Sequence, residues 1–463
     1  MAFTALMLAI AWAHPTSKSM ERGFPEKPSE DPFYQPPEGF ENDPPGTILR
    51  TRGVTTAFLG LIPNPVEANQ ILYRTTAVNG SAIATVTTVF KPWFPKEDRF
   101  VSFHTAYDSS ATKCNPSFTY QWGAPPNDLI TSAEMLILQV YLTLGYVVAS
   151  PDYEGPDAAF SPGYIEGMNV LDNMRAVSSF EDSGLTTDNP MIVGVGYSGG
   201  AIGTGWAAAL QPSYAPELNI KGWVAGGTPA NLKGTLLTIN NSLFSGFIPP
   251  AVAGLLKPSA YAEELAPLMN RVLTDKGRDM LEFANSHCAV ADLLQFPYMS
   301  LFDTDVQTMG GDLLSDPTIA AIMRENILGA KQEQTPTAPV FVYHATADEI
   351  IPYSNASAMV DSWCGNGADV KFTTFAAGGH ATTEVIAVPD AINFVEAAFA
   401  GDTGSGCSSN TELKSDLNPI ALGVQLEPIL VKLVDALVEM GDGDGNILED
   451  LATLKKTVGW DIW

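Results

Sequence analysis

The sequence predicts an α/β fold with a mostly parallel sheet and helices on both faces. Two observations carry this prediction. Short apolar runs rich in β-branched residues alternate with helix-like segments, which is the order of a parallel sheet. One alternation encloses Gly-Tyr-Ser-Gly-Gly at residues 196–200, a G-x-S-x-G sequence that occurs once in the chain.

The expected elements follow one another along the chain. Two early runs, 69–75 and 82–90, are separated by turn residues and indicate an antiparallel start to the sheet. The remaining strands and helices alternate. We expect strands at 100–107, 146–150, 191–197, 221–226, 340–345 and 370–377, and helices at 133–144, 167–179 and 201–210.

The G-x-S-x-G sequence lies between a predicted strand and a predicted helix. This order is that of the nucleophile elbow of α/β-hydrolases, in which a sharp turn lifts the serine above the sheet. Gly196 and Gly200 leave room for strand and helix to approach, and Tyr197 ends the strand. The alternative is an ordinary glycine-rich turn. The flanking elements favour an α/β-hydrolase fold with Ser198 as the nucleophile.

The general base is found by elimination among five histidines. Two precede the serine, one adjoins a cysteine in a helical insert, and one lies in an apolar run where a core or strand-end role is expected. These are His14, His104, His287 and His344. His380 follows a strand and two glycines and precedes a helix, which is the loop position of a base. A surface loop histidine is the alternative for His380.

The third member is expected after the preceding strand, because such sheets place their chemistry at the carboxyl ends of strands. Asp348 follows the strand 340–345 at that end. Asp369 begins a strand and Asp361 falls in a helical pattern. Glu349 is the nearest rival and is expected to be a solvated neighbour. A short side chain at the turn best reaches the imidazole, so we favour Asp348.

Composition limits the classes of partner. The 463 residues carry a formal net charge of −28, and such a surface repels the phosphates of nucleic acid. The chain contains no CxxC pair, so a metal cluster is not expected. A serine hydrolase also needs no cofactor, and none is expected. No stretch after the N-terminal segment is long and apolar enough to span a membrane.

Residues 1–13 are apolar and end in Ala-Trp-Ala, as a signal peptide does. A truncated or buried N-terminal segment is the alternative. An even number of cysteines suits two disulfides in an oxidising compartment. Three sequons are candidate glycosylation sites, at Asn79, Asn240 and Asn355. These features predict a secreted, extracellular protein.

Spacing predicts the domain organisation. A Pro-rich segment, 14–46, is expected to wrap over the surface. The catalytic domain is assigned to 47–229 and 335–402, because the 150 residues between Ser198 and Asp348 exceed what two β–α units need. Residues 230–334 are therefore predicted to form an inserted helical cap. Residues 403–463 are assigned to a C-terminal extension.

The cap is rich in apolar residues, which predicts an apolar acyl site. For each of them alone, a place in the cap's own core is the expected one: Leu243, Phe244, Phe247, Ile248, Val252, Leu255 and Leu256. In the extension, 429–438 shows an amphipathic helix pattern. The acidic run 441–450 superficially resembles a calcium loop, but Ile447 and Thr453 stand where Gly and Glu are needed.

From about Asp31 to Ala400 the chain resembles the fungal secretory lipases of the Candida antarctica lipase A type. Several segments carry the resemblance together with the elbow and His380. They are Asp31-Pro32-Phe33-Tyr34, Cys114-Asn115-Pro116-Ser117, Asp152-Tyr153-Glu154-Gly155, residues 213–220, Gly226-Gly227-Thr228-Pro229 and residues 348–353.

This resemblance implies a triad of Ser198, Asp348 and His380, and so favours Asp348 over Glu349. It implies an oxyanion hole formed by the N–H groups of Asp108 and Gly199. It also implies the disulfides Cys114–Cys288, which would tie the cap to the sheet, and Cys364–Cys407.

We therefore expect a secreted, monomeric serine lipase that hydrolyses triacylglycerol and other carboxylic esters at an oil–water interface, with acyl transfer to alcohols as a further reaction. Three alternatives stay open at this point. They are a serine peptidase of the same fold, an esterase for bulky esters without interfacial preference, and a non-catalytic binding protein. The last is disfavoured because all three triad residues are present.

Overall fold

One ten-stranded sheet forms the centre of the computed structural model, which describes residues 24–125 and 128–413. The strand order is β1-β4-β5-β7-β6-β8-β9-β10-β11-β12. Neighbours pair antiparallel from β1 to β7 and parallel from β7 to β12. The predicted α/β fold is thus confirmed. The strands are β1 (Ile48–Val54), β4 (Glu67–Thr76), β5 (Ala82–Lys91), β6 (Arg99–His104), β7 (Val147–Pro151), β8 (Met191–Tyr197), β9 (Ile220–Gly226), β10 (Val340–Ala345), β11 (Val370–Phe375) and β12 (Ser408–Glu412), with a separate pair β2 (Ala57–Phe58) and β3 (Ile62–Pro63).

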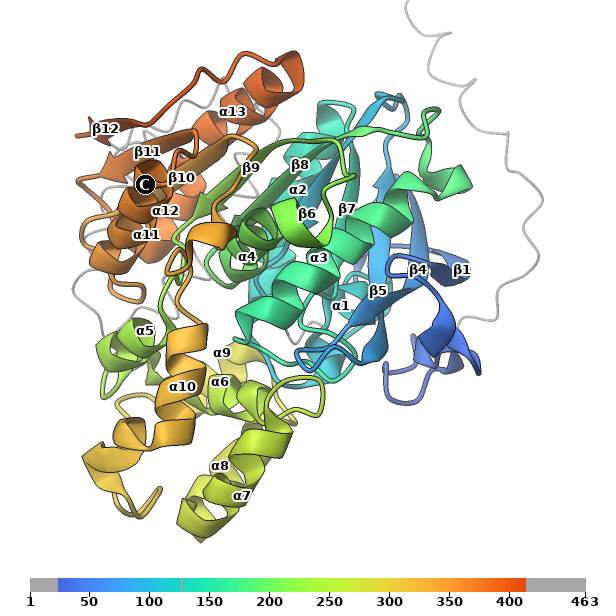
Figure 1. Ribbon diagram of the computed structural model, residues 1–463. Helices are drawn as coiled ribbons and strands as arrows, with labels where there is room; N and C mark the ends of the chain where they lie inside the picture. The colour runs from blue at the N-terminus through green and yellow to red at the C-terminus, as the bar shows by residue number, and fades with distance from the viewer. Residues whose placement is uncertain (1–23, 126–127, 414–463) are drawn as a thin grey trace, which may run out of the picture.

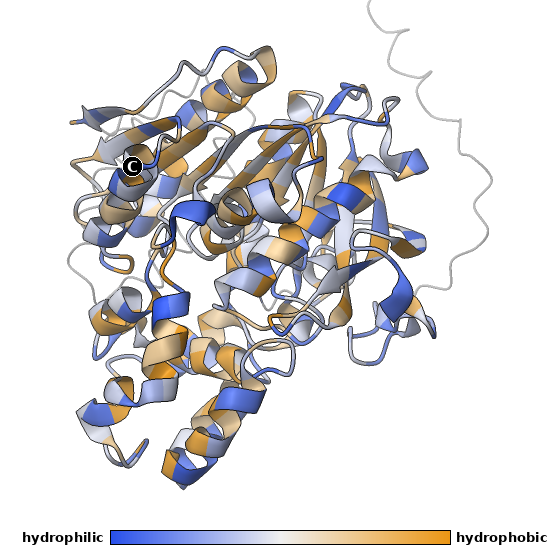
Figure 2. Cartoon of the chain, viewed as in Figure 1, coloured by the Kyte–Doolittle hydropathy of each residue, from blue (hydrophilic) through white to orange (hydrophobic). Residues whose placement is uncertain are grey.

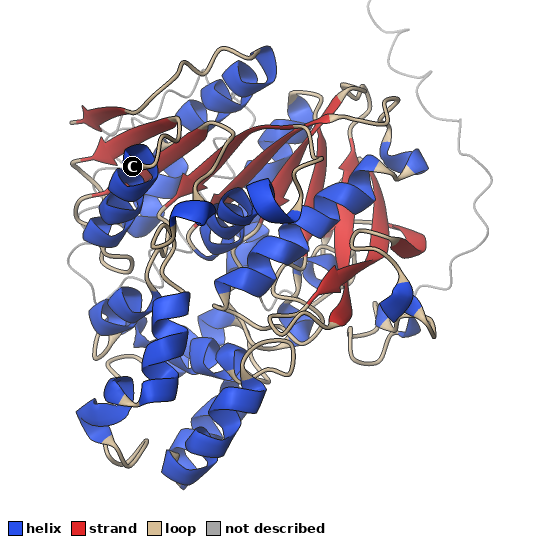
Figure 3. Ribbon diagram, viewed as in Figure 1, coloured by secondary structure: helices blue, strands red, loops and turns tan. Residues whose placement is uncertain are grey.

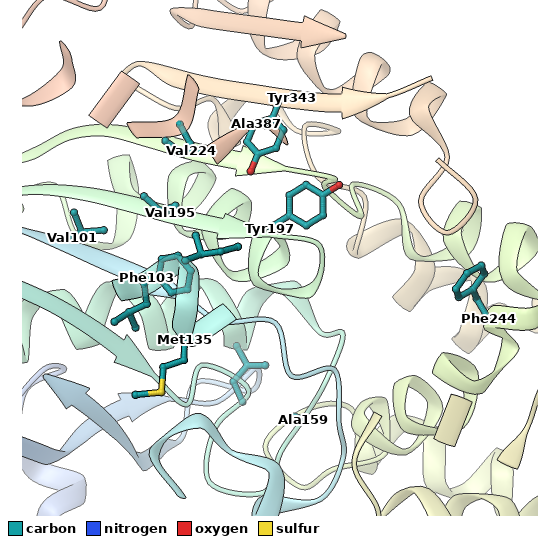
Figure 4. Close-up of a cluster of buried hydrophobic side chains, with 14 of the residues drawn as sticks. Val101, Phe103, Met135, Ala159, Val195, Tyr197, Val224, Phe244, Tyr343 and Ala387 are labelled. Carbon is teal, nitrogen blue, oxygen red and sulfur yellow. The ribbon is translucent and has the colours of Figure 1, made fainter. Parts of the chain in front are cut away.

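Helices cover both faces of the sheet (Figures 1 and 3). Alternate residues of a strand enter opposite cores, because side chains along a strand point to opposite faces. Val193 and Val195 pack in one core with Met135, and Ile192 packs in the other with Trp206. Figure 4 shows the first core. The covering helices are α1 (Pro116–Thr119), α2 (Leu129–Thr143), α3 (Gly163–Ser178), α4 (Gly199–Tyr214), α11 (Tyr353–Gly365), α12 (His380–Ile386) and α13 (Val388–Ala400).

A group of helices is inserted between β9 and β10 and gathers at one end of the sheet (Figure 1). This group corresponds to the predicted cap, and the residues between these two strands form no strand of the sheet. Figure 2 shows apolar residues both along the central strands and on the cap helices. The cap helices are α5 (Leu232–Ile239), α6 (Ile248–Leu255), α7 (Ala262–Val272), α8 (Asp275–Ala284), α9 (Ala289–Gln295) and α10 (Pro317–Glu325).

The structure moves one predicted boundary. The sheet does not end before residue 403, because β12 pairs parallel with β11, and Cys407 next to it is bonded to Cys364 of α11. Of the Pro-rich segment, residues 24–46 are described. Two short 3-10 turns there pack Phe33 and Phe40 on the outer strands β4 and β5. The predicted signal peptide 1–13, the amphipathic pattern 429–438 and the acidic run 441–450 lie outside the described residues.

Asp152, directly after β7, is hydrogen-bonded to the start of α1. Its buried carboxylate accepts hydrogen bonds from the Ser117 N–H (2.8 Å), the Ser117 hydroxyl and the Asn115 amide (3.3 Å). Burial raises the pKa of Asp152 to about 7, against the hydrogen bonds that lower it. Burial raises the pKa of other carboxyl groups in the same way, to between about 6 and about 7. They include Asp108, Asp128, Asp172, Asp292 and Glu349.

We expect the protein to lose stability as the pH rises from about 4 to about 7. The unfolded chain releases its carboxyl protons near pH 4, whereas these buried groups hold theirs to higher pH. For Asp152 alone the shift from the ordinary pKa to about 7 is worth about 4 kcal/mol, or roughly 4 °C in Tm for a chain of this length. Thermal unfolding at pH 4.5 and 7.5 measures the loss, and Asp152→Asn should reduce it. Equal Tm values at the two pH values would contradict this expectation.

Candidate active site

Ser198 lies in the turn that joins β8 to α4. Its backbone has φ 51° and ψ −122°, a conformation that costs a non-glycine residue about 1–3 kcal/mol. The Ser198 N–H donates to the Gly226 carbonyl of the neighbouring strand at 3.0 Å, which holds the turn in place. The predicted strand–turn–helix geometry is therefore present, and its serine is strained.

Two glycines permit this turn. A Cβ atom at Gly196 would lie 2.4 Å from the Gly200 carbonyl oxygen. A Cβ atom at Gly200 would lie 1.9 Å from the carbonyl oxygen of His104 on β6. Both are backbone contacts that no rotamer change can relieve. The close approach of strand, turn and helix therefore requires glycine at these two positions.

His380 and Asp348 meet Ser198 at the carboxyl ends of the parallel strands. The distance from His380 Nε2 to Ser198 Oγ is 2.7 Å, and that from His380 Nδ1 to Asp348 Oδ2 is also 2.7 Å. Asp348 follows β10 and His380 follows β11 as the first residue of α12. The three side chains form one hydrogen-bonded series, although they lie 150 and 32 residues apart in the chain.

The environment favours an ionised aspartate beside the imidazole. Burial raises the pKa of Asp348, but the neighbouring His380 and His344 outweigh it and hold the pKa well below the usual range. Burial lowers the pKa of His380, and the Asp348 carboxylate outweighs it and raises this pKa. Asp348 Oδ1 also accepts from the backbone N–H groups of Ile350 (3.0 Å) and Ile351 (2.7 Å). The carboxylate is thus oriented from both sides.

Glu349 is not the solvated neighbour that the sequence predicted. Its Oε2 accepts the backbone N–H of His380 at 3.0 Å, and its side chain lines a cavity next to Ser198. The turn after β10 directs both adjacent carboxylates to His380, one to the ring and one to the backbone. The Asp348 side chain, not that of Glu349, contacts the imidazole.

Two further residues support the series in ways that the sequence did not predict, although Tyr197 was expected as part of the elbow. His344, expected to have only a core or strand-end role, is buried on β10 with its Nε2 3.2 Å from Asp348 Oδ2 and 3.0 Å from the Ile351 carbonyl oxygen. The Tyr197 hydroxyl donates to the His380 carbonyl at 2.6 Å. The spacing of His344 four residues before Asp348 was the available signal for the first. The second contact spans 183 residues and has no local signal.

Among the described residues, the N–H groups of Asp108 and Gly199 donate to no backbone carbonyl, and both residues border the cavity at Ser198. Asp108 has φ 42°. The loop that contains Asp108 is held in place by hydrogen bonds of its two flanking residues. The Tyr107 hydroxyl accepts from the Glu154 N–H (2.9 Å), and the Ser109 hydroxyl donates to the His287 carbonyl of the cap (3.0 Å).

Two cavities meet at Ser198 and Asp108. The first has a volume of about 120 Å³ and an apolar wall, to which the cap helices α5, α6, α7 and α10 contribute. The second has a volume of about 200 Å³ and contains His380. The seven apolar cap residues named above, for each of which a core place was expected, all line one of the two cavities. Apolar periodicity does not distinguish a core wall from a cavity wall, because both bury the same side chains.

Both disulfides that the resemblance implied are present. Cys114–Cys288 joins the loop after β6 to the cap, and Cys364–Cys407 joins α11 to the start of β12. Among the sequons, Asn79 is exposed in the turn between β4 and β5. The Asn240 amide donates to Ser300 Oγ (3.2 Å), and the Asn355 amide nitrogen is buried.

The described part of the chain contains no arrangement of three or more His, Cys, Asp or Glu side chains that suits a metal ion. In residues 24–125 and 128–413, no helix is both long enough and apolar enough to cross a lipid bilayer.

A serine at a nucleophile elbow, linked through histidine to a buried aspartate at the carboxyl edge of a parallel sheet, defines a serine hydrolase of the α/β-hydrolase fold. Comparison with known proteins narrows this class. The family model described as "Secretory lipase" matches residues 120–406. The chain is 39% identical over 434 residues to the secreted triacylglycerol lipase LIP1 of Malassezia furfur, covering 93% of this chain and 87% of that one.

A second relative, the secreted triacylglycerol lipase LIP3 of Malassezia restricta, is 36% identical, with 95% of each chain covered. Among solved structures, Candida antarctica lipase A in its closed state matches with a TM-score of 0.80 and 31% identity, over 89% of this chain and 96% of that one. The chain belongs to the secretory lipase family.

Proposed function

We propose that this chain is a secreted serine lipase that hydrolyses triacylglycerols and other carboxylic esters through an acyl-enzyme on Ser198. The observation that carries the proposal is the hydrogen-bonded series Ser198–His380–Asp348 at the junction of two cavities, one of them apolar. The relatives' names, secreted triacylglycerol lipases, support the substrate class and the extracellular location.

In the proposed reaction, Ser198 Oγ attacks the ester carbonyl carbon while His380 Nε2 takes the hydroxyl proton. The N–H groups of Asp108 and Gly199 donate to the oxygen that becomes negative. His380 then gives its proton to the leaving alcohol, which departs and leaves an acyl-enzyme. A water molecule, activated by His380, releases the fatty acid, and an alcohol in its place gives acyl transfer. The reaction uses only groups of the chain, without a cofactor.

The first cavity is the proposed place for the acyl chain, because it borders Ser198 and Gly199 and its wall is apolar. We also propose that the enzyme is a monomer and that it acts on lipid at an oil–water interface.

The test is hydrolysis of tributyrin and trioctanoin by the secreted protein, followed in a pH-stat, with and without pretreatment by a p-nitrophenyl alkylphosphonate. We expect phosphonate-sensitive release of fatty acid and a phosphonyl adduct on the peptide containing Ser198, located by mass spectrometry. Activity confined to soluble short-chain esters would instead indicate an esterase, and cleavage of matched amides a peptidase. If the protein neither hydrolysed these esters nor formed a phosphonyl adduct, the non-catalytic binding protein would be the remaining alternative.

A substitution in the first cavity tests the acyl assignment. Ala251 lies on α6 and borders this cavity, so a phenyl ring at this position would occupy space that we assign to the acyl chain. We expect Ala251→Phe to lower kcat/KM for p-nitrophenyl laurate by about 10- to 100-fold, corresponding to about 1.4–3 kcal/mol of lost binding. The butyrate ester is the internal control and should change less than threefold. An equal loss for both chain lengths would contradict the assignment.

A further inference from the structure

The second cavity lies on the side of Ser198 where the alcohol leaves. His380 borders this cavity and not the first one. In the proposed function, on which this inference rests, His380 Nε2 protonates the leaving oxygen, so the alcohol part of the ester must lie beside the imidazole. The acyl chain and the alcohol part are thus separated into different cavities.

Two glutamates from distant parts of the chain border the second cavity. Glu134 belongs to α2 and Glu384 to α12, one turn after His380. Both side chains line the same cavity, and burial raises the pKa of both groups. The negative charge of Glu384 raises the pKa of Glu134 further. The two groups therefore hold a proton to a higher pH than exposed glutamates do.

The Glu134 side chain is almost fully buried, with 3% of the residue exposed, although it borders a cavity. Among the described residues, no N–H or hydroxyl group donates to Glu134 Oε2 or to Glu384 Oε1. A carboxyl oxygen has two lone pairs, and a single bound proton leaves several of them free. Buried polar groups without partners are costly, so these atoms require a ligand that hydrogen-bonds.

The remaining walls limit what that ligand is. Apolar side chains form most of the cavity, among them Ile130, Phe244 and Leu293. The described side chains offer no arrangement suited to a metal ion. An anionic ligand would add negative charge to a cavity that already contains four carboxyl groups, those of Glu134 and Glu384 together with those of Asp108 and Glu349. A neutral hydroxyl group can both donate to a free lone pair and accept a hydrogen bond from a protonated carboxyl group, and it fits an otherwise apolar cavity.

We propose that Glu134 and Glu384 form a hydroxyl-binding subsite that selects esters whose alcohol part carries a free hydroxyl group, such as mono- and diacylglycerols. The same subsite accepts polyols in preference to simple alcohols as acyl acceptors. The enzyme then removes fatty acids from partial glycerides more efficiently than from esters of monohydric alcohols with the same acyl chain.

The test compares glycerol 1-monobutyrate with propyl butyrate, which share the acyl group and the three-carbon alcohol skeleton and differ only in two hydroxyl groups. We expect wild-type kcat/KM to be at least 10-fold higher for the glycerol ester. In Glu134→Leu/Glu384→Leu this ratio should fall at least 10-fold. Glu384 is only partly buried, so Glu384→Ala is a second variant that should fold and should lower the ratio at least threefold.

Glu264→Gln, on the exposed surface of α7, is the matched control and should leave the ratio unchanged. A wild-type ratio near one overturns the inference, as does a ratio that stays constant in folded variants active on propyl butyrate. If the wild-type protein hydrolyses neither ester nor any triacylglycerol, the proposed function itself fails and the inference fails with it. Hydrolysis of both esters at equal rates removes the subsite alone.

Discussion

Ser198→Ala is expected to lower kcat for ester hydrolysis by roughly 10⁵- to 10⁶-fold, the largest effect of any single change in this chain. The substitution removes the only oxygen of the series that can attack the ester carbonyl. It leaves His380, Asp348 and the N–H groups of Asp108 and Gly199 in place, so a small residual rate should remain. Release of p-nitrophenol from p-nitrophenyl butyrate measures both rates over this range.

Alanine tests the chemistry without disturbing the turn. It removes one atom and keeps the Ser198 backbone N–H that donates to Gly226. We therefore expect the variant to unfold at the same temperature as the wild type and to form no phosphonate adduct. A folded variant that retained more than a tenth of wild-type turnover would exclude Ser198 as the nucleophile.

Asp348→Asn is expected to lower kcat by roughly 10⁴-fold, the cost seen when a triad aspartate becomes an amide. The asparagine oxygen would accept the hydrogen bonds from the N–H groups of Ile350 and Ile351, because these groups already donate to Asp348 Oδ1. The amide nitrogen would then face His380 Nδ1 and donate to it. The imidazole proton would have to move to Nε2, where it faces Ser198 and prevents the ring from accepting the serine proton. Measuring kcat with p-nitrophenyl butyrate tests this.

The adjacent carboxylate provides the matched control. Glu349 accepts the backbone N–H of His380, and a glutamine oxygen can accept the same hydrogen bond. Glu349→Gln should therefore cost less than about 10-fold in kcat, since no ring tautomer changes. If Glu349→Gln proved the more damaging of the two, the acid would be Glu349 and the assignment of Asp348 would be wrong.

Local patterns in the sequence were sufficient for the strands and for the order of the chemistry. The run 191–197 and the run 340–345 became β8 and β10 at the residues expected, because buried parallel strands are continuous apolar segments with β-branched residues. Ser198, Asp348 and His380 could be chosen because each directly follows such a strand. The requirement for Gly196 and Gly200 could also be predicted, because the turn has no space for a side chain at either position.

Only the tertiary structure decided which residues surround the hydrogen-bonded series Ser198–His380–Asp348. Glu349 contacts the His380 backbone, and His344 lies beside Asp348, because the turn after β10 folds back on the sheet. Glu134 and Glu384 lie 250 residues apart and meet only because α2 and α12 pack on the same face.

The sequence by itself therefore predicted the elements, the elbow and the three residues of the hydrogen-bonded series, because their signals are contained within a few consecutive positions. It could not determine which apolar cap residues border a cavity, which carboxyl groups are forced together, or where the sheet ends at β12. These features depend on contacts between segments far apart in the chain. Periodicity shows that a side chain is buried but not which distant segment it contacts.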